Sequence, residues 1–173
     1  MSKAHLLQSA DESLAAANLY TLLVRHHKTH TRIRMRLLIP HVNTRHFPHT
    51  SQLLQSYLPS IFRSSCYNDE ELPFPKEVVS TELGHLFEHI LLEYLCILQL
   101  ESGLDTASYE GRTNWNWVRD PRGTFHITIH TNEEEIPIFK EALTRTMTLM
   151  NIILDENSDL STTLPIPSTT TRQ

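Results

Sequence analysis

Apolar and polar positions alternate from Thr31 to Val42, which is the spacing of a strand with one buried face. Arginines fill the polar positions, so we expect Arg34 and Arg36 to lie on the same face of a sheet. That face is either solvated or a basic strip that holds the carboxylates of an acidic or zwitterionic ligand. The sequence alone leaves both interpretations open.

Helical spacing of apolar residues marks four other segments. The expected helices are Ala10 to His27, Thr50 to Phe62, Leu83 to Leu98 and Ile136 to Leu154. Ser9 and Glu12 form a capping box at the start of the first helix, and Pro137 stands in the first turn of the last one. The third segment is apolar over a wide arc, so it is predicted to be a buried helix.

Two further segments predict a β-hairpin, Tyr109 to Val118 and Thr124 to His130, joined by a turn that ends at Gly123. If Gly123 forms a bulge, Trp115 and Trp117 lie on an apolar face that packs under the third helix. The opposite face then carries hydrogen-bonding side chains that could bind a substrate: Arg112, Asn114, Asn116 and His126.

These elements together predict a single α/β domain, more specifically α+β, with a small antiparallel or mixed sheet covered by helices. We expect residues 1–30 to be a helical extension and residues 31–154 to form the domain. Residues 155–173 are rich in Ser, Thr and Pro, which is typical of a disordered tail.

Charge and composition exclude several classes of protein. A net charge of -5 argues against a general nucleic-acid binder, whose surface would be basic. Two cysteines are too few for a disulfide framework, and the N-terminus lacks the layout of a signal peptide. No apolar run reaches membrane-spanning length, so we expect a cytoplasmic protein without a membrane partner. Homo-oligomerisation stays open.

The segment His85-Leu86-Phe87-Glu88-His89 has the H-x-x-E-H order of inverzincin hydrolases. On a helix, His85 and His89 lie about 40° apart and Glu88 lies about 60° to one side of His85. Two imidazoles so placed could bind one zinc ion, and Glu88 could then act as general base. Glu93, one turn further on, is either a third ligand or a residue that orients an imidazole.

Ionisable groups on a buried helix need partners, because an unpaired buried charge costs several kcal/mol. The polar stripe of this helix, formed by His85, Glu88, His89 and Glu93, is therefore either a metal or catalytic site or a structural network of His and Glu.

The order of segments resembles the N-terminal domain of cyanophycin synthetase over about residues 31 to 152. The similarity rests on LLQSYLPSIF, a loop with a cysteine, STELGHLFEHILLEYL, a hairpin and a helix. The family motif falls on Gly84, His85, Glu88, His89 and Glu93. The sequence departs from the family at Ser64 and Ser65, where a histidine usually precedes the loop cysteine, and the first helix has no clear counterpart.

The resemblance implies a domain that anchors a polymer of aspartate with arginine side branches and, in some members, cuts it as a metallopeptidase. The ligase domains of the family do not fit within this chain, so we expect a free-standing relative.

The first hypothesis is thus a zinc-dependent peptidase for cyanophycin or a related peptide or isopeptide, with Arg112 or Asn114 holding the substrate. The second is a non-catalytic module that binds such a polymer or a protein. A third is a transition-metal-binding protein without hydrolytic activity.

Overall fold

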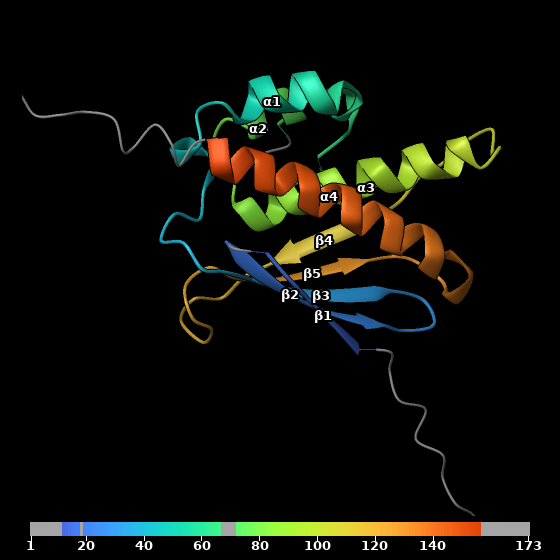
Figure 1. The fold of residues 1–173 in the computed structure, drawn as a ribbon, viewed down its shortest axis with the longest axis horizontal. Coiled ribbons are helices and arrows are strands. Elements are labelled where there is room, and N and C mark those ends of the chain that lie inside the picture. The colour runs from blue at the N-terminus through green and yellow to red at the C-terminus, as the bar shows by residue number, and fades with distance from the viewer. Residues whose placement is uncertain (1–11, 18, 67–71, 157–173) are drawn as a thin grey trace, which may run out of the picture.

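A five-stranded antiparallel sheet forms the base of the computed structural model, which describes residues 12–17, 19–66 and 72–156 (Figure 1). The strands lie in the order β1-β2-β3-β5-β4 and comprise β1 (Glu12–Ala16), β2 (Tyr20–His26), β3 (Thr31–Leu37), β4 (Gly111–Asn114) and β5 (Thr124–Ile129). All neighbouring pairs are antiparallel. The predicted α+β class, with a small sheet covered by helices, is confirmed.

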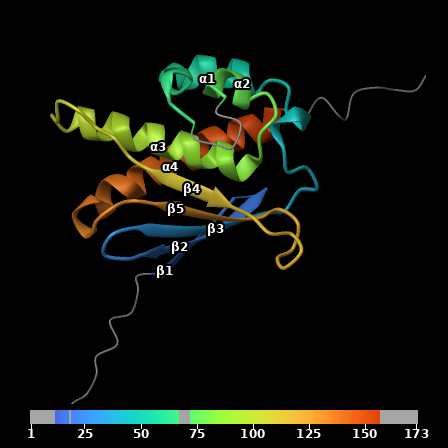
Figure 2. The ribbon, with the colours of Figure 1, turned by 180° about the vertical axis from the view of Figure 1, so that it is seen from behind.

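Helices cover one face of the sheet in two layers (Figures 1 and 2). The long helices α3 (Leu83–Glu101) and α4 (Ile136–Glu156) lie next to the sheet, and α1 (Thr50–Tyr57) and α2 (Phe74–Glu77) lie beyond them. Short 3-10 segments are η1 (Thr44–His46), η2 (Pro59–Arg63) and η3 (Glu133–Glu135). The core lies between the sheet and the two long helices.

The predicted helix from Thr50 to Phe62 is divided in two. α1 ends at Tyr57, Leu58 leaves the helical region, and Pro59 opens the 3-10 segment η2. Proline disfavours helical backbone at the preceding residue, which explains the break.

The predicted helix from Ala10 to His27 is wrong over the described residues. β1 and β2 form an antiparallel hairpin, and β2 pairs in turn with β3. Tyr20, Leu22 and Val24 are buried at alternate positions of β2, which gives this segment a place in the core that a helix would not. The hairpin is therefore an integral part of the domain, and the expected boundary at residue 30 does not separate two units.

β3 has the predicted alternation, with Arg32, Arg34 and Arg36 exposed between buried neighbours. These arginines lie on the sheet face opposite the helices, because the apolar side chains between them face the core.

The β4–β5 hairpin puts Arg112, Asn114 and His126 on one face as predicted, with Arg112 opposite Thr128 and Asn114 opposite His126. β4 ends at Asn114, however, so the tryptophans lie in the connecting loop rather than in the strand. Trp115 is 40% exposed.

The sheet face that bears the tryptophans was expected to pack under α3, and Phe125 makes the closest contact on that face. Trp115 and Trp117 pack on Phe125, with ring centroids 5.9 and 5.7 Å away. The contact with α3 is made by Phe125 itself: a Cβ added at Gly84 would lie 2.3 Å from a carbon of its ring.

Two expectations, a disordered tail from residue 155 and the absence of a membrane-spanning run, concern the helices α4 and α3. α4 includes Asp155 and Glu156, and the rest of the predicted disordered tail, residues 157–173, lies outside the described residues. Among the described helices, α3 alone is long and apolar enough to cross a membrane, although no such run was expected. Half of that stretch is buried within the protein, which is also typical of a core helix.

Candidate metal centre

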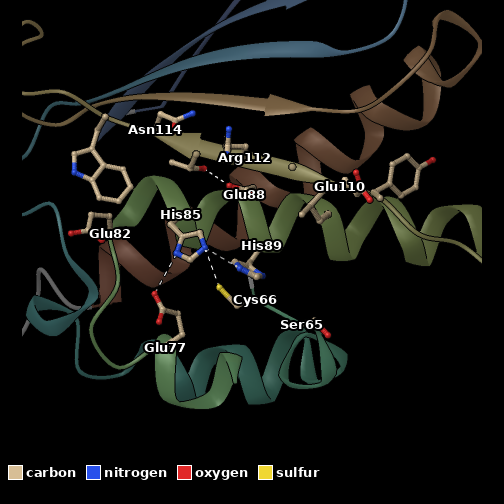
Figure 3. A pocket seen from close by; sticks show the side chains of 15 residues that line it. Ser65, Cys66, Glu77, Glu82, His85, Glu88, His89, Glu110, Arg112 and Asn114 are labelled. Atoms are coloured by element: carbon tan, nitrogen blue, oxygen red, sulfur yellow. Dashed lines mark hydrogen bonds and ion pairs between the residues drawn. The ribbon is translucent and has the colours of Figure 1, made fainter. Parts of the chain in front are cut away.

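A pocket of about 680 Å³ lies between α3, the free edge of β4 and the segment around Cys66 (Figure 3). α3 carries His85, Glu88 and His89 into it, because these polar positions fall on the side of the helix that faces away from the apolar core. The helix thus fulfils the predicted role of bringing the H-x-x-E-H motif to one cavity.

Two imidazoles and a thiol converge in this pocket. The Nε2 atoms of His85 and His89 are 3.1 Å apart, and Cys66 Sγ lies 3.5 Å from His85 Nε2. The three donor atoms all lie within 4.8 Å of one another. Cys66, His85 and His89 therefore form a largely buried group that could bind a metal ion.

A hydrogen-bonded relay orients His85. The hydroxyl of Thr81 donates to a carboxylate oxygen of Glu77 at 3.0 Å, and its oxygen lies 2.8 Å from His85 Nδ1. Since that hydroxyl proton is engaged with Glu77, His85 Nδ1 is the donor, and the lone pair on its Nε2 faces His89 and Cys66. Oriented imidazoles of this kind, with a carboxylate behind them, are typical of metal ligands.

Both imidazoles are held in the neutral form that a metal ligand requires. Burial lowers the pKa of His85, against the opposing effect of the Glu77 and Glu82 carboxylates. Burial, assisted by the neighbouring His85, lowers the pKa of His89 to about 3. The rings therefore do not need to release protons at neutral pH before they bind a cation.

Glu88 lies on the β4 side of α3, whereas the two histidines face Cys66 (Figure 3). Its side chain is only 5% exposed and accepts a short hydrogen bond from the hydroxyl of Thr113. Burial raises the pKa of Glu88 to about 7, although the hydrogen bond from Thr113 opposes the shift. A carboxyl group with this pKa can both accept and donate a proton near neutral pH.

Gly111 makes room for this carboxylate. A Cβ added at Gly111 would lie 2.8 Å from a carboxylate oxygen of Glu88, which is closer than such atoms come without a shift. A larger residue at this position would therefore displace Glu88.

The structure brings together only part of the predicted site. His85, Glu88 and His89 line the pocket, but Glu93 lies outside both the pocket and the group of three donor atoms. Glu93 is two turns beyond His85 along a straight helix, so its side chain lies about 12 Å away along the axis. Among the described residues, the third donor is Cys66, so Glu93 does not take the role of third ligand, which was one of the two expected for it.

Arg112 and Asn114 border the pocket, because β4 is the edge strand of the sheet. Their side chains nevertheless belong to the open face, since Thr113 between them faces Glu88 and the register sets Asn114 opposite His126, which is itself opposite Arg34. Arg36 lies on the same open face, His126 is paired there with Asp120 at 3.0 Å, and the side chain of Asn116 accepts from Val118 N–H in the loop. A single surface that contains all six residues is therefore not observed.

Cys66, Thr81 and Thr113 are the site residues that the sequence did not reveal as such. Cys66 precedes His85 by 19 residues, and the loop cysteine of the resembling segment is the signal that could have found it. The partners of His85 and Glu88 depend on the packing of α2 and β4 against α3, which no local pattern predicts.

Comparison of the chain with models of protein families, with curated proteins and with solved structures finds no match.

Proposed function

We propose that this protein is a zinc-dependent hydrolase that cleaves a peptide or isopeptide bond. Cys66, His85 and His89 hold the metal, and Glu88 acts as general base. A bound zinc ion would supply Lewis-acid polarisation of the substrate carbonyl and generate a nucleophile from water near neutral pH.

One observation supports this function above the others: two neutral imidazoles and a thiol converge in the same pocket as a buried carboxyl group. In a tetrahedral zinc site the donor separations are about 3.3 Å for two nitrogens and about 3.6 Å for nitrogen and sulfur. Here the two Nε2 atoms are 3.1 Å apart and Cys66 Sγ lies 3.5 Å from His85 Nε2, with all three donor atoms within 4.8 Å of one another. The group includes no oxygen donor, which disfavours Mg²⁺ and Ca²⁺.

In the proposed hydrolysis, Glu88 transfers protons, and other residues of the pocket hold the reacting groups in position. Glu88 can take a proton from water and return it to the leaving amine, since its pKa is raised to about 7 by burial. Thr113 holds the carboxylate in place, and the Thr81–Glu77 relay holds His85. The motif resemblance makes cyanophycin, the aspartate polymer with arginine side branches, the first substrate to test.

A binding module is the second candidate, and the Glu88–Thr113 bond favours it. This bond and the close approach to Gly111 link α3 to β4, so Glu88 could serve as a structural contact without taking part in any reaction. In that case the pocket binds a polymer or protein segment and cleaves nothing.

The zinc content of the purified protein is the first measurement that distinguishes the hydrolase from the binding module. Protein purified without a His-tag is expected to carry about one zinc ion per chain, measured by mass spectrometry of the metal. Cys66→Ser should lower this content, whereas Cys96→Ser is the matched control, because Cys96 lies on α3 outside the donor group. Protein that takes up no zinc at micromolar concentration rules out the metal hypothesis.

The second step tests the general base. Glu88→Gln should abolish hydrolysis of cyanophycin while zinc content stays the same and the melting temperature does not fall, because the amide keeps the shape and can still accept from Thr113. A wild type that retains the polymer on a column without cleaving it supports the binding module instead.

A further inference from the structure

β4 is the last strand of the sheet, and its outer edge borders the pocket that contains the metal-binding group. The strand runs along one wall of the pocket, and Cys66 and Glu77 lie across from it (Figure 3). The pocket is therefore a groove with a strand edge on one side.

The ladder between β4 and β5 determines which backbone groups face this groove. The N–H group of His130 donates to the carbonyl oxygen of Glu110 at 2.9 Å, so the even-numbered residues of β4 bond to β5. In an antiparallel ladder, the residues between bonded pairs direct their N–H and C=O groups the other way. The backbone groups of Gly111 and Thr113 therefore point out of the sheet edge.

These outward groups have no backbone partner in another segment within the described part of the chain. Unpaired N–H and C=O groups along an edge strand are a template on which an extended segment can pair. The side chain of Thr113 meanwhile contacts Glu88. A segment paired with this edge would thus lie next to the proposed general base.

The charges that line the groove are mostly negative. The carboxylates of Glu77, Glu82 and Glu110 stand against the single guanidinium of Arg112. Complementary charge favours a partner with basic side chains.

We infer that the groove binds an extended peptide with basic side chains, which adds to the free edge of β4 as a further strand and lies across the Cys66, His85 and His89 group. That this peptide is also the bond-cleavage substrate rests on the proposed function; its binding does not. A second copy of the chain paired through the same edge is the alternative occupant that the measurement of oligomeric state tests.

The test uses the spacing of backbone groups in a strand. The probe is a fluorescein-labelled hexapeptide of alternating alanine and arginine, bound to the full-length Glu88→Gln protein so that it is not cut. Two derivatives carry N-methyl groups, one on every alanine and the other on every arginine. A paired strand directs alternate N–H groups to its neighbour, so one derivative should bind at least about tenfold more weakly and the other within about threefold of the parent. Equal behaviour of the two derivatives overturns the inference.

Charge and oligomeric state complete the test. Glu82→Gln should weaken binding about two- to fivefold, whereas Glu133→Gln, at an exposed carboxylate far along the chain, should not. If the free protein sediments as a dimer that the peptide dissociates, a second copy occupies the edge and the inference is wrong.

Repeating the titration with metal-free protein separates this inference from the proposed function. If only one N-methylated derivative binds weakly, and the protein takes up no zinc and cleaves nothing, then the peptide adds as a strand but the protein is not a hydrolase. If the protein cleaves the peptide but binds both N-methylated derivatives equally, then it is a hydrolase and the inference of strand addition is wrong.

Discussion

The polar stripe of α3 and the polar face of β3 both interrupt an apolar pattern with charged or titratable residues, yet their surroundings are opposite. On α3, Glu88 and His89 are 5% and 6% exposed. On β3, Arg34 and Arg36 are exposed on the open face of the sheet. The same kind of sequence pattern therefore produces a buried cluster in one place and a solvated surface in the other.

The difference in burial explains why the side chains of only one of the two regions are fixed by hydrogen bonds. A buried polar group must be hydrogen-bonded or neutral, so the α3 stripe is tied to Thr81, Glu77 and Thr113 and has shifted pKa values. An exposed arginine meets no such demand, because water solvates it. Perturbed groups in a cavity are the better functional candidates.

The largest expected effect concerns the packing that holds the buried stripe in place. Gly84→Ala should destabilise the protein by about 3 kcal/mol, since the new methyl group would overlap the ring of Phe125. This outweighs the roughly 1 kcal/mol that alanine normally gains over glycine in a helix. Urea denaturation measures the change, with Thr144→Ala on the exposed side of α4 as control. A more stable Gly84→Ala protein would mean that α3 does not press on β5.

Much of the fold could be predicted because local periodicity agreed with the final structure. The alternation of β3, the apolar arc of α3 and the polar face of the β4–β5 hairpin each depend on spacing within one segment. The N-terminal hairpin of β1 and β2 could not be predicted in this way, since a run with Leu14 and several alanines has helical propensity. Pairing with β3 overrides that propensity.

The candidate site was predictable to the extent that it is local. His85, Glu88 and His89 lie within one helical turn and a half, so their spacing alone brings them together. Cys66 and Thr113 reach the pocket through tertiary packing, from 19 residues before His85 and 25 residues after Glu88. Arg34 and His126 were expected near the site and are cross-strand neighbours, but on the other face of the sheet.

The next effect is linked to pH. The folded state raises the pKa of Glu88 from 4.5 to about 7, so the unfolded chain loses its proton first as pH rises. Stability from this group is complete below pH 4.5 and is lost as pH rises through about 7, by about 3 kcal/mol. Metal-free Glu88→Gln protein should therefore gain about that much relative to metal-free wild type between pH 5 and pH 8.

His89 acts in the opposite direction but is present in both proteins. Its lowered pKa contributes stability above pH 6.5 that is lost as pH falls towards about 3, and this cancels in the difference. Parallel stability curves for the two proteins would indicate a Glu88 that is ionised at all these pH values, which contradicts its neutral burial.

A smaller effect is expected from the relay behind His85. Thr81→Val removes the hydroxyl that accepts from His85 Nδ1 and donates to Glu77, so the imidazole loses its fixed orientation. Zinc affinity should fall about tenfold, measured by competition with a chelating dye. Thr146→Val is the matched control, because this buried threonine bonds only within α4. Unchanged affinity would mean that the relay does not support the metal centre.

The smallest effect is expected on the open face of the sheet. Arg34→Ala combined with Arg36→Ala should change the free energy of unfolding by no more than about 0.5 kcal/mol, because both side chains are exposed. Zinc content should stay the same, and a basic peptide should bind at least as well, since two positive charges have been removed. Titration of the fluorescent arginine peptide against the double variant measures this. A tenfold loss of affinity would place these arginines in the binding surface after all, and the contrast between the buried stripe and the open face would then no longer separate a site from its surroundings.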